Sequence, residues 1–127
     1  MKATAHFDTS EFDCKDGTAV PDKCMGNVFA LCMALEQLRL VVEAPITIIS
    51  GYRSREYNRK CGGAEKSQHL TGKAADIRVR GKEPEEVASI LEDLIKSGTI
   101  PQGGIGVYPT QNFVHYDVRG NRARWKG

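Results

Sequence analysis

One segment of the chain, residues 83 to 98, carries both a start and a stop signal for an amphipathic helix. Pro84 lies in the expected first turn, where a proline costs no hydrogen bond, and Gly98 ends the pattern. Between them, apolar residues recur at helical spacing: Val87, Ile90, Leu91, Leu94 and Ile95. A helix with one apolar face needs a sheet or another helix to cover it, so this segment predicts a layered fold.

The rest of the chain supplies those layers. Helical spacing of Val28, Leu31, Leu35 and Leu38 predicts a second helix over roughly residues 22 to 40. Strands are predicted from β-branched or alternating runs at residues 45–50, 73–81, 103–109 and 112–120, the last two as an antiparallel hairpin. The 127 residues suffice for one core. The sequence therefore predicts a single α+β domain, residues 1–127, with helices packed on a small, mainly antiparallel sheet.

Composition excludes several classes of partner. The net charge is +2, and no stretch interleaves basic with aromatic residues, so no nucleic-acid partner is expected. No continuous run approaches the ~18 apolar residues of a membrane span, and the first 17 residues lack the pattern of a secretory signal. A soluble chain without a membrane partner is predicted. We expect a monomer, because no exposed apolar stripe is evident.

The four cysteines do not follow a metal-binding or redox spacing. They lie at positions 14, 24, 32 and 61, without a CxxC pair. Cys32 falls within the apolar helical pattern and is expected to be a buried thiol. A bridge between Cys14 and Cys24 stays open, since an even number of cysteines does not fix their pairing.

The segment SQHLTGKAADI, residues 67–77, suggests a metal site. His69 precedes Asp76 by seven positions, and Gly72 lets the chain turn between them. His115, on the last predicted strand, can complete a set of two imidazoles and one carboxylate, which suits a catalytic zinc with three protein ligands. The same set holds iron in non-haem oxygenases, and an isolated His–Asp pair can also be a structural hydrogen bond, so these residues alone leave the metal open.

A wider pattern resembles a known family, the M15 zinc peptidases, which include D-Ala-D-Ala carboxypeptidases and related peptidoglycan peptidases. The likeness is closest to the short single-domain branch and spans nearly the whole chain. It rests on SGYRS (50–54), GGAEKSQHLTGKAADI (62–77) and GGIGVYPTQNFVHYDVRGNRARW (103–125). The resemblance implies a hedgehog-like fold and one Zn²⁺ ion, held by His69, Asp76 and His115.

The same resemblance implies roles for other residues. Arg53 would bind a substrate carbonyl or carboxylate and stabilise the charged intermediate, although a surface ion pair is an alternative. Ser67 matches a substrate-contacting serine, or it is a turn cap. Tyr108 could donate a hydrogen bond to the substrate.

One departure from the family pattern concerns the general base. Many relatives have an acid three residues before the last histidine, or a histidine two before it, where this chain has Asn112 and Phe113. Asp117 shares a strand face with His115. It is expected either to act as the general base or to orient His115, and the sequence leaves both roles open.

The predicted function is zinc-dependent hydrolysis of amide bonds in peptidoglycan stem peptides, first as a D-Ala-D-Ala carboxypeptidase. One alternative is an L,D- or D,D-endopeptidase, similar to an endolysin. Another is a zinc-containing module that binds wall peptides without cleaving them, and a third is iron-dependent oxidation. The predicted site of action is the cell wall. The lack of a signal-peptide pattern would suit release by a phage, removal of a signal, or a cytoplasmic dipeptidase.

Overall fold

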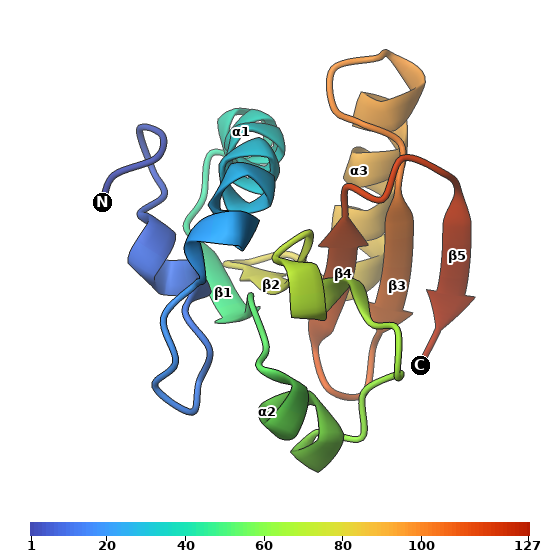
Figure 1. Cartoon of the computed structure of the whole chain (residues 1–127). Coiled ribbons are helices and arrows are strands. Elements are labelled where there is room, and N and C mark those ends of the chain that lie inside the picture. Colours follow the sequence, from blue (N-terminus) through green and yellow to red (C-terminus); the bar gives the residue numbers. More distant parts are fainter.

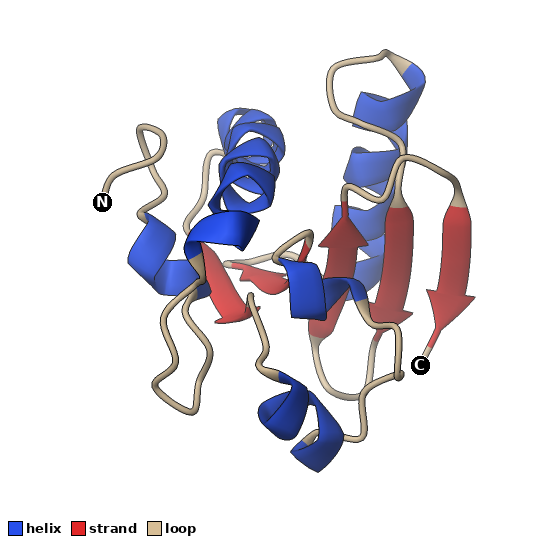
Figure 2. Ribbon diagram, viewed as in Figure 1, coloured by secondary structure: helices blue, strands red, loops and turns tan.

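The computed structural model describes all 127 residues as three helices and a five-stranded sheet (Figure 2). The helices are α1 (Asp22–Val42), α2 (Arg55–Lys60) and α3 (Pro84–Lys96). The strands are β1 (Ile46–Ser50), β2 (Ala74–Val79), β3 (Gly104–Tyr108), β4 (Phe113–Asp117) and β5 (Ala123–Lys126). Two 3₁₀ helices, η1 (Thr9–Phe12) and η2 (Gln68–Thr71), lie in the connections. The predicted α+β class is confirmed.

The sheet has the strand order β1-β2-β4-β3-β5. All neighbouring strands are antiparallel except β3 and β5, which run parallel. Strand β5 was missed, because ARWK looks like a charged chain end rather than a strand. In the β2–β4 register, Asp76 lies opposite His115, so the sheet itself brings together two residues that are 39 positions apart.

Helices α1 and α3 cover one face of the sheet, and α2 and η2 lie over the other (Figure 1). Side chains of successive strand residues point to opposite faces. Ala75, Ile77 and Val79 of β2 therefore reach the core under α1 and α3, while Asp76 points to the face under η2. The predicted alternation along this strand is thus present, and the face under α2 and η2 is where a site can form.

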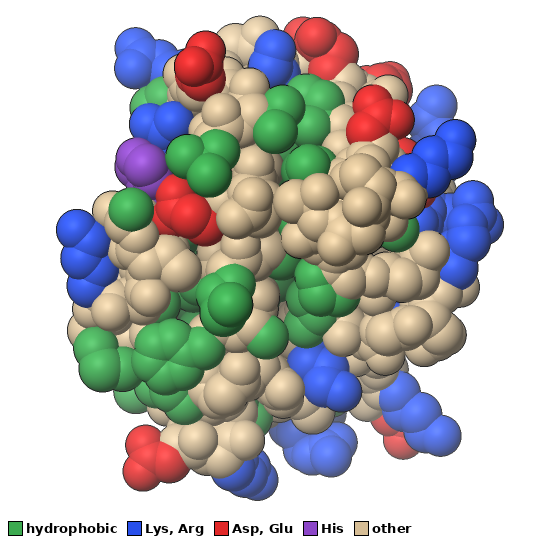
Figure 3. Space-filling view, turned by 90° about the horizontal axis from the view of Figure 1, so that it is seen from above, with side chains coloured by type: hydrophobic (Ala, Val, Ile, Leu, Met, Phe, Trp, Pro, Cys, Tyr) green, Lys and Arg blue, Asp and Glu red, His purple; other side chains and the backbone are tan.

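No membrane span was expected from the sequence, but helix α1 is strongly apolar. By length and composition alone it could cross a membrane, with a mean hydropathy of 1.4 over 18 residues. In the structure, apolar side chains of this helix pack in the core, where Leu31, Leu35 and Leu38 are fully buried. Met33 and Leu40 are nevertheless more than half exposed, so part of the apolar surface of this helix lies outside the core. Seen from above, hydrophobic side chains reach the surface between charged ones (Figure 3).

The N-terminal segment is part of the domain. Phe7 and Phe12 are buried in the core, and His6 bonds Glu36 on α1 through its backbone and its ring. A Cβ at Gly51 would lie 2.7 Å from the Phe12 Cα atom, so η1 packs directly against the chain that follows β1. This contact helps to place the backbone around Gly51, which borders the site.

All four cysteines are free in this structure. Cys32 is completely buried, as predicted, and burial raises the pKa of its thiol to about 12. Cys14 and Cys24 are also buried, and only Cys61 is exposed.

Candidate metal centre

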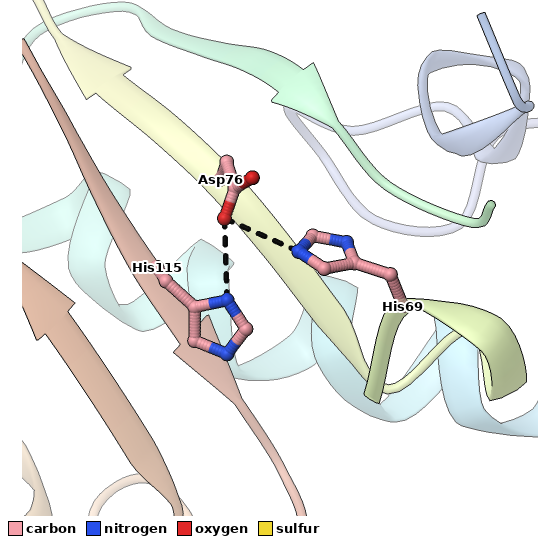
Figure 4. A group of neighbouring side chains, drawn as sticks. All are labelled: His69, Asp76 and His115. Atoms are coloured by element: carbon pink, nitrogen blue, oxygen red, sulfur yellow. Dashed lines mark hydrogen bonds and ion pairs between the residues drawn. The ribbon is translucent and has the colours of Figure 1, made fainter. Parts of the chain in front are cut away.

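The structure brings His69, Asp76 and His115 together on the face of the sheet opposite α1 and α3. One potential ligand atom from each residue lies within 4.8 Å of the others, and all three side chains are buried. Figure 4 shows both imidazole rings pointing at the Asp76 carboxylate. The His69 Nε2 and His115 Nδ1 atoms each lie 3.2 Å from Asp76 Oδ1.

His69 is held in place by the backbone around it. It lies in η2, which Ser67 caps and which ends at Gly72, whose φ of 75° suits glycine. The Nδ1 atom of the ring is 2.7 Å from the Gly51 carbonyl oxygen. Because a carbonyl can only accept, Nδ1 carries a proton, and in the neutral ring Nε2 has the free lone pair.

His115 is oriented by a carboxylate instead of a carbonyl. Its Nε2 atom is 2.7 Å from Asp117 Oδ2, so this nitrogen donates and Nδ1 has the lone pair in the neutral ring. Two imidazole lone pairs and the Asp76 oxygen then converge with no hydrogen between them. Such a group of acceptors is stable only with protons or a cation in its centre, and two imidazoles with one carboxylate suit zinc.

Asp117 has no exposed surface and its carboxylate is saturated with hydrogen bonds. Its Oδ1 atom accepts from the backbone N–H of Gly104 and from Arg119, and its Oδ2 atom accepts from Arg119 and His115. Burial alone would raise the pKa of Asp117, but the bonds from His115 and Arg119 outweigh it and hold the pKa well below its usual range. This carboxylate is ionised and occupied.

Arg53 belongs to the site but is not a surface ion pair. Its Nη2 atom donates to Asp76 Oδ2 at 3.0 Å, and its side chain is only 14% exposed. Asp76 therefore presents one oxygen to the histidines and the other to Arg53.

One wall of a cleft of about 670 Å³ is formed by His69, Asp76, His115 and Arg53. The connection from α2 to η2 lines one side, and Tyr108, Phe113 and Trp125 line the other. Ser67 lines the cleft too, but its hydroxyl caps the backbone N–H of His69. The Tyr108 ring stacks on Phe113, with centroids 4.3 Å apart, and its hydroxyl accepts from the Trp125 indole.

Sequence reasoning missed two contributors. Asn58, on α2, is 4% exposed and bonds Arg53. Trp125, on β5, lies 4.9 Å from His115 between ring centroids and 5.5 Å from the Arg119 guanidinium. An asparagine in a short polar helix and a tryptophan near a chain end give no pattern that points to a site.

Trp125 offers a direct test of metal binding near His115. It is the only tryptophan in the chain, and a bound cation is the largest charge in its neighbourhood. Titration of metal-free protein with Zn²⁺ should change the indole fluorescence and saturate at one equivalent. The variant His6→Ala, altered far from the cleft, should show the same change. Zinc uptake of one equivalent with constant fluorescence would contradict binding beside His115.

Comparison with known proteins gives the chain a family. A probable peptidoglycan L,D-endopeptidase MepK of Haemophilus influenzae is 40% identical over 89 residues, which are 66% of this chain and 44% of that protein. The peptidoglycan L,D-endopeptidase MepK of Escherichia coli K12 is 38% identical over 80 residues, 58% of this chain and 40% of that protein. This chain spans less than half the length of these relatives. The family model described as Peptidase M15 matches residues 5–117, nearly the whole chain, and the protein therefore belongs to the M15 peptidase family.

Proposed function

We propose that residues 1–127 form one peptidase domain that uses zinc to hydrolyse an amide bond inside peptidoglycan stem peptides or their cross-links. The observation that carries this proposal is the convergence of His69, Asp76 and His115 at the wall of the cleft. Three ligands beside an open space are the arrangement of a catalytic zinc, which keeps one coordination position for water.

Zinc is the metal that we assign to these ligands. M15 peptidases in general depend on zinc, which favours it over the iron that the same donor set could hold. When bound, zinc supplies a water of lowered pKa, near ~7, and polarises the scissile carbonyl. His69 would bind it through Nε2, His115 through Nδ1 and Asp76 through Oδ1, the atoms that already face one another.

Arg53 and Asp117 are not metal ligands in this proposal. Arg53 stabilises charge on the substrate, and Asp117 orients a ligand. Arg53 uses one N–H on Asp76, and we assign its free N–H groups to the substrate carbonyl, where they stabilise developing negative charge. Of the two roles open for Asp117, the hydrogen-bonding pattern supports the orienting one. Its oxygens already accept from His115, Arg119 and Gly104, which leaves none free to take a proton from water.

Two observations favour an endopeptidase over the carboxypeptidase that the sequence predicted first. Both curated relatives carry the name L,D-endopeptidase. The two guanidinium groups that line the cleft, Arg53 and Arg119, are each paired with a buried carboxylate. A carboxypeptidase needs a cation for the free carboxylate of its substrate. The charges of both arginines are already paired, so Lys66 is the one lining cation without an ion pair that could meet this need.

A second candidate, a module that binds wall peptides without cleaving them, is favoured by one feature of the cleft. Among its lining residues Asp76 is the only acid, and it faces the histidines and Arg53. No separate carboxylate is therefore available as a general base on the cleft wall.

Product analysis separates these functions. Purified peptidoglycan fragments with defined L,D and D,D bonds are incubated with the zinc-loaded protein, with and without a chelator, and analysed by mass spectrometry. We expect cleavage at an internal L,D bond that stops with the chelator. Free D-alanine as the first product would instead indicate a carboxypeptidase. Zinc-loaded protein that binds the fragments but releases no product would contradict the peptidase and favour the binding module.

A further inference from the structure

Asn58 is a buried polar residue for which the proposed chemistry has no use. It lies on α2 and is 4% exposed, and it lines no part of the large cleft. Its side-chain Oδ1 accepts from Arg53 Nη1 at 3.2 Å, and its Nδ2 donates to the Ala64 carbonyl at 2.9 Å. Since Arg53 can only donate and a carbonyl can only accept, these partners fix the orientation of the amide.

The Arg53 guanidinium is held by three separate elements. Its Nε donates to Ser50 on β1, its Nη1 to Asn58 on α2 and its Nη2 to Asp76 on β2. A guanidinium has five N–H donors, so two remain for a substrate. Asn58 is the one partner that comes from outside the sheet, and without it the outer edge of the guanidinium has no support.

Asn58 also ties down the segment that borders the cleft. Its backbone carbonyl accepts from the N–H of Gly63, and its side-chain amide donates to the carbonyl of Ala64, the residue after Gly63. Gly63 lies so close that a Cβ there would overlap the Asn58 amide oxygen and approach Arg53 Nη1 to 3.1 Å. Gly62, Gly63 and Ala64 all line the cleft, so one amide connects this border to the arginine.

We propose that Asn58 is a positioning residue, which fixes the Arg53 guanidinium toward the scissile carbonyl and couples it to the cleft border at residues 62–64. This inference rests on the proposed peptidase function. An amide suits the position because it accepts on one side and donates on the other. Aspartate has the same shape, but it would set an oxygen against the Ala64 carbonyl and would compete with Asp76 for Arg53.

The first test compares kcat and KM in four variants: Asn58→Ala, Asn58→Asp, Arg53→Ala and the double variant with alanine at both positions. Misplacement of a catalytic group by about 1 Å costs on the order of 100-fold in rate, and we expect kcat to fall by this order for both Asn58 variants. Zinc content should stay at one equivalent. In the Arg53→Ala background, Asn58→Ala should have almost no further effect on kcat, because it acts through the arginine. If Asn58→Ala lowered kcat by the same factor in the wild-type protein and in the Arg53→Ala variant, the proposal would be overturned.

Asn27 supplies the matched control. Its side-chain amide donates to the Thr71 carbonyl of η2 but does not touch Arg53, so Asn27→Ala should keep kcat. A second measurement needs no substrate. The Nη protons of Arg53 give separate NMR signals only while rotation of the guanidinium is hindered, and Asn58→Ala should merge them. Unchanged Nη signals would contradict the positioning role, whereas inactivity of the wild type against every fragment would contradict only the peptidase function.

Discussion

Replacement of His69 or His115 by alanine should abolish zinc binding and hydrolysis together. Each histidine supplies one of the three proposed ligand atoms, and two remaining ligands leave a zinc site incomplete. Polarisation by the metal is worth several kcal/mol in the transition state, and each 1.36 kcal/mol is tenfold in rate. We therefore expect hydrolysis to fall by about 1,000-fold or more. Zinc content after dialysis, measured by mass spectrometry, and initial rates on the cleaved fragment are the two readouts.

His6 is the matched control for these variants. It is the one histidine of the chain outside the site, and it bonds Glu36 on α1 rather than any residue of the cleft. His6→Ala should keep one equivalent of zinc and the wild-type rate. Circular dichroism shows whether each variant folds, since both site histidines are buried. Full zinc content in folded His69→Ala and His115→Ala would refute the ligand assignment.

The sequence alone predicted most of the elements that build the site. The signals around Pro84 and Gly98 and the alternation around Asp76 depend on local spacing, and both elements formed as expected. The proximity of Asp76 and His115 follows from pairing of their two strands, which alternation alone cannot specify. Resemblance to the M15 family implied that both residues hold one metal ion, and the family match confirms the resemblance. The strand pairing itself is seen only in the structure.

The features that the sequence did not predict depend on tertiary contacts. Strand β5 has only four residues, and its one pairing, with β3, sets Trp125 beside His115. Asn58 looks like an ordinary polar residue until the partners of its amide are known. The occupied state of Asp117 likewise depends on Arg119 and on the backbone of Gly104, which no spacing rule places against it.

Replacement of Asp117 by asparagine should weaken zinc binding about 10- to 100-fold, the usual effect of removing a group that orients a metal ligand. The carboxylate holds His115 with Nε2 as the donor, which leaves Nδ1 for the metal. Asparagine keeps the shape but can present its NH₂ group to the ring, which favours the wrong tautomer. Competition with a chromogenic chelator gives the zinc affinity, and rates at rising zinc concentrations show whether activity returns.

The two roles of Asp117 predict opposite results in this variant. If the carboxylate orients His115, saturating zinc should restore most of the hydrolysis, because no proton transfer depends on it. If Asp117 is the general base, zinc affinity stays near the wild-type value while the rate at saturating zinc falls by about 100-fold or more. Asp93→Asn, which removes an exposed charge on α3, should alter neither quantity. Loss of the charge also leaves Arg119 without its buried partner, so a lower melting temperature is expected under both roles and does not distinguish them.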